Sequence, residues 1–421
     1  MKKGKMISMF LSSILMVSLI SAAGFSAVGA AEKGPIKIGF IAPRTGNFAQ
    51  LGIEMIEGAK LLLEENNYSV AGRKIEFIVE DEGAGPDTAV TKARKLIKHD
   101  VVHLVAGVFM ASAGYAVAPV CIEAQVPLFI TEAGSDDLTQ RRASRLVSRL
   151  SVNGGDVGHA AGEYAYKELG WRKAITIGLD YAWGYEAGGG FHRVFEDLGG
   201  KVIQKLWPPV NTMDFSPYVT NMERETDGIW NVVSGAATIR LMKTLRDSGI
   251  LKKTGLLCGG TTVDESMLPA LADDALGVVS IWNYSGALDT PKNKRFRELC
   301  KKKLNKDATW SIQQSWVGLE WILQAMKEIN GEVENKEKFS NALREVKLDS
   351  LRGLLKMDSY GHPIQDYFVR RVDRVKDGWG GFQNTVIKTI PAVNQFWTWD
   401  AKTYLSQPGY NRDNPPCKYC K

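Results

Sequence analysis

The sequence predicts an α/β protein made of two lobes of similar size, each built around a parallel sheet. Short apolar runs typical of buried strands alternate with segments of helical periodicity. The first strand is expected at residues 36–42, and a helical pattern follows at residues 50–66. Such alternation is typical of βαβ units. The pattern restarts after Ser151, so the 421 residues contain two successive α/β sets.

The elements expected in each set follow from these patterns. In the first set, the strands are residues 36–42, 75–80, 101–106 and 127–131, and the helices are 50–66, 86–98 and 114–123. In the second set, the strands are residues 174–179, 201–206, 228–233, 255–258 and 278–282, and the helices are 155–169, 184–198, 218–225 and 236–248. Residues 292–330 are strongly helical, and residues 354–375 predict strands with a turn at 358–361.

The first 31 residues predict a secretory signal peptide. Three lysines within the first five residues precede an apolar run at residues 6–20, and small residues continue to Ala31. The apolar run is short for a membrane-spanning helix. We therefore expect cleavage after Ala30 or Ala31. No cysteine near that point provides a lipid anchor, so we expect a periplasmic protein.

Composition is ordinary for a globular protein, with 44% apolar and 24% charged residues. Loss of the three lysines in the signal peptide lowers the formal net charge from +6 to +3. No long basic stripe remains, and we therefore expect no nucleic-acid partner.

The cysteines indicate no zinc site and no redox centre. Cys417 and Cys420 form one C-x-x-C in a Pro-rich tail, where they either pair with a cysteine or remain as free thiols. A thioredoxin-type role requires the motif at the start of a helix that follows a strand. The other three, Cys121, Cys258 and Cys300, are well separated along the chain.

No catalytic motif is present in the sequence. It contains no nucleophile elbow, no P-loop and no H-E-x-x-H helix. His99 and His103 are four residues apart, but His99 ends a predicted helix and His103 begins a strand, so they should not share a face. We expect a protein that is not an enzyme, with no catalytic residues, no metal site and no cofactor.

Small and hydroxyl-bearing residues gather where predicted strands lead into helices. Each such junction alone is typical of a helix cap. Together they favour a binding cleft, because ligands of doubly wound folds lie beyond the carboxyl ends of the strands, and helix N-termini suit a carboxylate. The junctions are residues 44–48, 107–114, 131–137 and 234–238, with an aromatic junction at 180–184.

Several of these stretches resemble the type I periplasmic substrate-binding proteins of the branched-chain amino acid (leucine/isoleucine/valine) ABC transporter family. The similarity spans residues 36–375. The stretches that carry it are residues 37–46, Gly52, 58–61, 118–127, Asp180-Tyr-Ala-Trp-Gly184, Asp214-Phe-Ser-Pro-Tyr218 and 289–294.

The resemblance implies two Rossmann-like lobes joined by a three-strand hinge, the Venus-flytrap arrangement. The crossovers are expected near Leu150, Ile281 and Phe368. The expected domains are the signal peptide at 1–31, lobe one at 35–150 plus 282–367, lobe two at 151–281 plus 368–395, and a C-terminal tail with the C-x-x-C at 396–421.

The resemblance also implies ligand-binding residues. Backbone amides and hydroxyls of lobe one are expected to hold a ligand carboxylate, at Ala111, Ser112, Ala133, Gly134 and Ser135. Lobe two is expected to supply Trp183 as a cover for the ligand, with Ser234 and Gly235 as further contacts. Leu51 stands where the family often has an aromatic residue.

One position departs from the family pattern. Amino-acid binders carry an acidic residue in lobe two for the ligand ammonium, whereas this chain has Thr261, with Asp264 and Glu265 following later. Without an acidic residue at this position, the charge-assisted hydrogen bond to the ligand ammonium group is lost. Aromatic residues would instead suit an aromatic or apolar carboxylate, so amino acid and other carboxylate both remain open. These residues are Phe48, Phe109 and Trp183, with Trp282 or Tyr284 as further candidates.

The implied function is that of the extracytoplasmic substrate-binding component of an ABC importer. Its expected partners are the small-molecule ligand and the membrane permease and ATPase subunits, and the protein is expected to be a monomer. The alternative is a ligand-sensing module that passes its signal to a separate membrane receptor.

Overall fold

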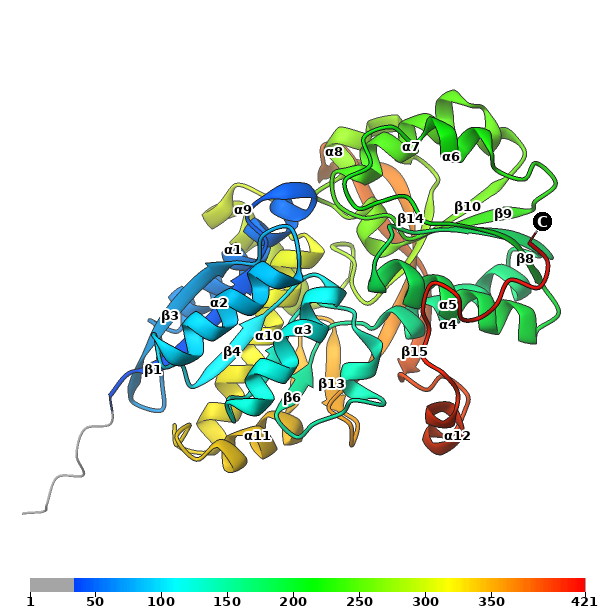
Figure 1. Ribbon diagram of the computed structural model, residues 1–421. Helices are drawn as coiled ribbons and strands as arrows, with labels where there is room; N and C mark the ends of the chain where they lie inside the picture. The colour runs from blue at the N-terminus through cyan, green and yellow to red at the C-terminus, as the bar shows by residue number, and fades with distance from the viewer. Residues whose placement is uncertain (1–33, 421) are drawn as a thin grey trace, which may run out of the picture. The chain divides into compact units, whose positions relative to one another are not determined.

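Two sheets organise the chain in the computed structural model, which describes residues 34–420. The predicted signal peptide at residues 1–31 lies outside the described residues. The first sheet has six strands in the order β2-β3-β1-β4-β5-β6, and the second has nine, in the order β12-β13-β14-β11-β10-β9-β7-β8 with β15 paired to β14. The prediction of an α/β protein with two lobes is confirmed (Figure 1).

The first lobe is centred on parallel strands. β1 lies between β3 and β4, and both pairings are parallel. Its side chains are almost all buried, which explains why it forms an unbroken apolar run. The strands are β1 (Ile36–Ala42), β2 (Ser69–Val70), β3 (Arg73–Asp81), β4 (Leu104–Gly107), β5 (Leu128–Ile130) and β6 (Val147–Arg149).

Helices from distant parts of the sequence cover this sheet. Helices α1 and α10 pack against each other, as do α2 and α3 (Figure 1). Segments beyond residue 290 therefore return to the first lobe. The helices are α1 (Ala49–Glu65), α2 (Pro86–Lys98), α3 (Ala111–Glu123), α9 (Pro291–Leu304), α10 (Trp310–Glu328) and α11 (Lys336–Glu345).

The second lobe repeats the plan and ends in antiparallel strands. β8, β7, β9, β10 and β11 are parallel, and β14 then pairs antiparallel with β11. The strands of this sheet are β7 (Lys173–Ile177), β8 (Lys201–Leu206), β9 (Gly228–Asn231), β10 (Gly255–Gly259), β11 (Val279–Trp282), β12 (Lys347–Ser350), β13 (Gly353–Met357), β14 (Pro363–Trp379) and β15 (Phe382–Val393). Of these, β12 and β13 lie on the side of the first lobe, where β13 contacts α11 (Figure 1). The helices are α4 (Gly154–Lys167), α5 (Ala182–Asp197), α6 (Ser216–Thr220), α7 (Ala237–Asp247) and α8 (Leu268–Leu271).

Several observed elements differ from those predicted, and three of them have a local explanation. Helix α6 has only five residues, because the chain turns at Asn221 and the Glu223 amide donates to the Gln204 side chain. The helical segment at 292–330 is divided, since Asn305 has a left-handed φ of 54° after α9. β15 was not predicted, because polar residues interrupt the apolar ones along it and it forms no apolar run. It pairs with β14 as a two-stranded ribbon.

The last residues form a C-terminal strap, defined here as residues 394–420, which includes helix α12 (Ala401–Ser406). Tyr410 of the strap packs against α5 at Gly189 and hydrogen bonds to His159 of α4 at 2.7 Å. Arg141 of the first lobe donates to the Gln407 carbonyl. The C-x-x-C closes as a Cys417–Cys420 disulfide. The strap thus contacts both lobes.

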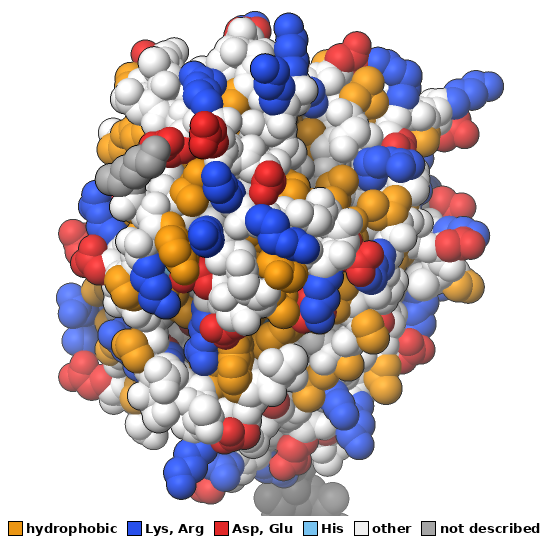
Figure 2. All heavy atoms as spheres, turned by 90° about the vertical axis from the view of Figure 1, so that its right-hand side faces the viewer, with side chains coloured by type: hydrophobic (Ala, Val, Ile, Leu, Met, Phe, Trp, Pro, Cys, Tyr) orange, Lys and Arg blue, Asp and Glu red, His pale blue; other side chains and the backbone are white. Residues whose placement is uncertain are grey.

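The surface and the helices add two observations. Figure 2 shows Lys and Arg interspersed with Asp and Glu on the face it displays. Among residues 34–420, no helix has both the length and the apolar character needed to cross a bilayer.

Candidate functional site

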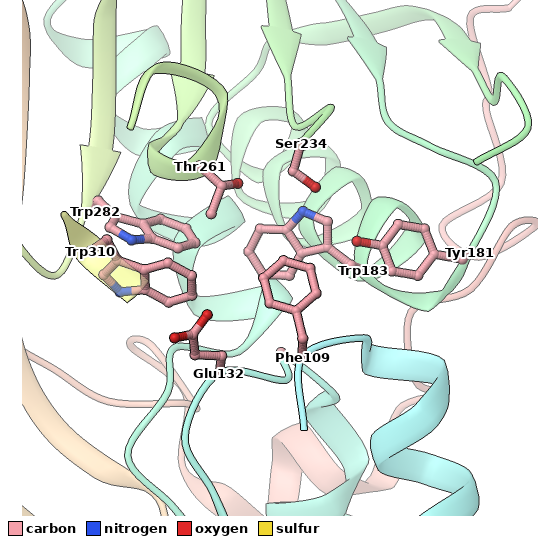
Figure 3. A pocket seen from close by; sticks show the side chains of 9 residues that line it. Phe109, Glu132, Tyr181, Trp183, Ser234, Thr261, Trp282 and Trp310 are labelled. Carbon is pink, nitrogen blue, oxygen red and sulfur yellow. The ribbon is translucent and has the colours of Figure 1, made fainter. Parts of the chain in front are cut away.

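A pocket lies between the two lobes at the carboxyl ends of their parallel strands. We call it the interlobe pocket, and its cavity volume is about 20 Å³. From the first lobe, Phe109 follows β4, Glu132 and Gly134 follow β5, and Trp310 begins α10. The second-lobe lining residues are Tyr181, Trp183, Ser234, Thr261 and Trp282 (Figure 3). This is where doubly wound sheets place their ligands.

Three tryptophans form a continuous aromatic wall. The Trp183 and Trp282 rings meet edge to face with centroids 5.7 Å apart, and Trp282 and Trp310 do the same at 5.0 Å. The indole N–H of Trp183 donates to the Val232 carbonyl at 3.2 Å, and that of Trp310 donates to Asn283 Oδ1 at 3.0 Å. These contacts orient the rings, so the wall is preorganised for an apolar or aromatic group.

Gly134 allows the wall to approach the first lobe. A Cβ at this position would lie 2.5 Å from Trp183 Cε3. Any side chain here would therefore displace the Trp183 ring. The two residues come from different lobes, and both were predicted as ligand-binding.

Two buried polar groups in the pocket have no hydrogen-bond partner among the described residues. They are the Thr261 hydroxyl and the indole N–H of Trp282, whose residues are 4% and 1% exposed. Buried polar groups are normally paired. Both groups are therefore available to hydrogen bond with a polar atom of a ligand.

Glu132 is the carboxyl group of the pocket lining, and it is 3% exposed. Its Oε2 accepts a hydrogen bond from Ser311 Oγ at 3.0 Å. Burial raises the pKa of Glu132 well above its ordinary value, and the nearby carboxyls of Asp264 and Glu54 raise it further. Burial therefore favours the neutral carboxyl of Glu132 over its carboxylate, and a positive charge beside it would favour the carboxylate.

A second buried acid occupies the backbone amides that precede α3. Glu82 accepts hydrogen bonds from the amides of Phe109 at 2.7 Å and Met110 at 2.8 Å. Burial raises its pKa to about 7, while these two bonds lower it. The Glu82 carboxyl therefore occupies the two backbone amides that immediately precede α3.

The predicted site residues divide into two groups. Phe109, Gly134, Trp183, Ser234 and Thr261 line the interlobe pocket. Phe48 packs behind Phe109, with ring centroids 4.9 Å apart. The others lie outside the lining, namely Leu51, Ala111, Ser112, Ala133, Ser135 and Gly235.

Ser135 and Gly235 have definite roles outside the lining. The Ser135 hydroxyl donates to the Ala111 carbonyl at 2.7 Å, and the Ser135 carbonyl accepts from Arg149. Gly235 has a φ of 71° and lies against Asn47 of the first lobe. Asn47 Nδ2 donates to the Ser234 carbonyl at 3.1 Å, so this contact joins the lobes beside the pocket.

Sequence reasoning missed Glu132, Tyr181 and Trp310 as lining residues, and it raised Trp282 only as a further candidate. Glu132 and Tyr181 lie within junctions that the sequence had marked, directly beside predicted residues. Trp310 begins a helix far along the chain, and no junction pattern indicated it. Tyr284 is buried outside the pocket, where its hydroxyl donates to Asn293.

Comparison with known proteins decides the family. The model of the family described as "Periplasmic binding protein" matches residues 35–378. The chain belongs to this family. Its members bind solutes for transport and are not enzymes, which agrees with the absence of catalytic motifs in the sequence. Among residues 34–420, no three His, Cys, Asp or Glu side chains are arranged to hold a metal ion.

Individual relatives of this periplasmic binding protein cover nearly its whole length. An ABC transporter substrate-binding protein from Sphaerobacter thermophilus is 31% identical, with a TM-score of 0.80 over 86% of this chain and 99% of that one. A solute-binding protein of an ABC transporter from Rhodopseudomonas palustris BisB5, solved with 3,4-dihydroxybenzoic acid, is 28% identical, with a TM-score of 0.81 over 86% and 99%. The Leu/Ile/Val-binding protein homolog 6 of Brucella melitensis is 28% identical over 89% of this chain and 96% of its own length.

Proposed function

We propose that this periplasmic binding protein captures a small hydrophobic amino acid or a related, aromatic carboxylate between its lobes for an ABC importer. The observation that carries the proposal is the wall of Trp183, Trp282 and Trp310 in a pocket lined by both lobes. Flat aromatic surfaces with a few polar groups suit a ligand that has an apolar body and one polar end. The relatives named for Leu/Ile/Val and solved with dihydroxybenzoic acid support the same two ligand classes.

Within this proposal, the predicted site residues keep distinct roles. Trp183 covers the body of the ligand, while Thr261 and Ser234 offer hydroxyls to its polar atoms. Ala111, Ser112, Ala133, Gly134 and Ser135 surround the start of α3, and they are proposed to hold the ligand carboxylate once the lobes rearrange around it.

Ligand uptake requires the lobes to move. A cavity of about 20 Å³ holds about one water, whereas a benzene-sized ligand occupies a cavity of about 150 Å³. We propose lobe one at residues 35–150 plus 282–367, and lobe two at 151–281 plus 368–395. Rotation about the crossovers near Leu150, Ile281 and Phe368 opens the pocket, and ligand contacts favour the closed form.

The cellular setting completes the proposal. The signal peptide at residues 1–31 directs export to the periplasm, where the mature protein acts as a monomer. The closed form then delivers its ligand to the permease and ATPase subunits of the importer. Mass spectrometry of the exported protein should find an N-terminus near Glu32, and an intact Met1 start would contradict export.

A thermal-shift screen followed by calorimetry tests the ligand class. The panel contains leucine, isoleucine, valine, phenylalanine, benzoate, 4-hydroxybenzoate and short aliphatic acids. A ligand present at about a hundred times its Kd stabilises the folded protein by about 2.7 kcal/mol, which gives a clear rise in melting temperature. Saturable binding of one of these compounds supports the proposal. If none of them binds, the proposed ligand classes are wrong.

A further inference from the structure

The interlobe pocket contains an acid without a basic partner. Among the described residues 34–420, its lining includes the carboxyl of Glu132 but no Lys, Arg or His side chain. Figure 3 shows this carboxyl in the pocket below Trp310. A ligand group that binds here therefore meets an acid and aromatic rings instead of a positive charge.

The groups around Glu132 are hydroxyls and other acids. Ser311 and Ser315 of α10 donate to its two oxygens at 3.0 and 3.5 Å. Glu54 of α1 and Asp264 after β10 are further acids close to it. These two acids are held at the same helix start, Glu54 by the Thr309 hydroxyl and Asp264 by the Trp310 amide. A buried carboxylate is stable only when it is paired or well hydrogen-bonded. The two serine hydroxyls satisfy part of this need.

The aromatic wall beside Glu132 also suits a cation. Trp282 and Trp310, whose rings meet edge to face, both line the pocket. Ammonium groups bind to such faces, and Trp is the strongest of the aromatic side chains in this interaction. Both the carboxyl and the rings therefore favour a positive group at this end of the pocket.

The part of the pocket next to Glu132 is unfavourable for a ligand whose only polar group is a carboxylate. The amides of Phe109 and Met110 are already used by Glu82, and the pocket adds a second acid. A ligand whose only polar group is a carboxylate must therefore bind away from Glu132 or beside its neutral form.

We propose that Glu132 determines specificity by pairing with a protonated amine of the ligand, so that the protein prefers ligands that carry an ammonium group. This inference rests on the proposed function and selects the amino-acid class within it. In the bound state the Glu132 carboxylate pairs with the ammonium group of the ligand, which stays protonated.

Matched ligands and variants test the inference by calorimetry on the mature full-length protein. Phenylalanine and 3-phenylpropanoate differ only in the ammonium group. The expected wild-type preference for phenylalanine is at least about tenfold, and Glu132→Gln should remove most of it. Glu186→Gln is the control, because Glu186 is a buried acid that accepts a hydrogen bond from Tyr115 and does not line the pocket. It should keep the preference. Melting temperatures establish that both variants are folded.

A second measurement uses the wild-type protein alone. Titration of phenylalanine at several pH values should show an affinity that rises with pH, because burial raises the pKa of Glu132 and only its carboxylate pairs with the ammonium group. An affinity that does not rise with pH, or equal effects of both substitutions, overturns the role of Glu132. Tighter binding of 3-phenylpropanoate or 4-hydroxybenzoate than of phenylalanine overturns the inference but leaves the proposed function intact. If no compound of the panel binds, both fail.

Discussion

Asn47 of the first lobe caps a helix of the second lobe: its Oδ1 accepts a hydrogen bond from the Ala237 amide, the first residue of α7, at 2.9 Å. Its Nδ2 also donates to the Ser234 carbonyl, and its own carbonyl accepts from the Ala236 amide at 3.1 Å. Free amides at a helix start normally find a partner within their own segment. Here the partner comes from the opposite lobe, so the cap exists only while the lobes are in contact.

Asn47→Ala should weaken ligand binding. The change removes two hydrogen bonds that join the lobes, each worth about 1 kcal/mol, so the Kd should rise roughly thirtyfold in calorimetry. The folded state of each lobe should be unaffected. Asn66→Ala serves as the control, because the Asn66 side chain donates to the Leu62 carbonyl within α1. If both variants bind as the wild type does, the cap contributes nothing to closure.

Trp183→Ala should raise the Kd at least about tenfold while the protein stays folded. The substitution removes a ring that forms part of the pocket wall and meets Trp282 at 5.7 Å. Circular dichroism and calorimetry provide the two readings. Trp316→Ala is the matched control, since Trp316 packs on Phe296 away from the pocket. An unchanged affinity in Trp183→Ala would remove this residue from the site.

The fold was predictable because its strongest signals are local. Parallel strands buried on both faces form short apolar runs, and strand β1 was expected at its observed bounds. The ribbon of β14 and β15 was only partly predicted, because its polar alternation resembles a turn-rich segment. Its place in the sheet depends on pairing with β11, which no local pattern encodes.

The site was predictable where its residues follow strands and less so elsewhere. Phe109, Trp183 and Ser234 stand at junctions that end strands, so their convergence follows from the topology. Trp310 reaches the pocket because α10 packs against α1, a contact between segments about 250 residues apart. The orientation of Glu132 depends on Ser311 of the same distant helix. The spacing of residues along the sequence does not indicate such long-range packing.

The stability of the ligand-free protein should fall as pH rises from 5.5 to 8.5. Burial and the Asp264 charge raise the pKa of Glu54 to about 8, so the folded state holds a proton that the unfolded state loses above about pH 4.5. This contribution is complete below pH 4.5 and is lost as pH passes 8. Urea unfolding at several pH values should show a smaller fall in Glu54→Gln. Glu64→Gln, an exposed change on the same helix, should leave the slope unchanged.

Gly189→Ala should displace the C-terminal strap. A Cβ at Gly189 would lie 2.7 Å from the Cβ of Tyr410 and 2.8 Å from its Cγ. Alanine normally stabilises a helix by about 1 kcal/mol relative to glycine, so a lower melting temperature would report the clash. Limited proteolysis should also cut residues 408–416 faster. Gly85→Ala is the control, because open space surrounds that position. Equal cleavage of both variants would contradict the packing of Tyr410 on α5.

Gly235→Ala should disrupt the contact between the lobes at Asn47, because the added methyl group lies on the second-lobe side of that contact. A Cβ at Gly235 would lie 2.5 Å from the Asn47 carbonyl oxygen, and that atom belongs to a backbone that cannot easily move. The left-handed φ of 71° adds a local cost of about 1 kcal/mol. Gly249→Ala separates the two effects, since Gly249 has a φ of 70° and its Cβ would meet only the Lys252 side chain at 3.9 Å. Both variants should lose similar stability, but only Gly235→Ala should lose ligand affinity, by at least about tenfold. Equal affinities would mean that the lobes need not meet at this point for the ligand to bind.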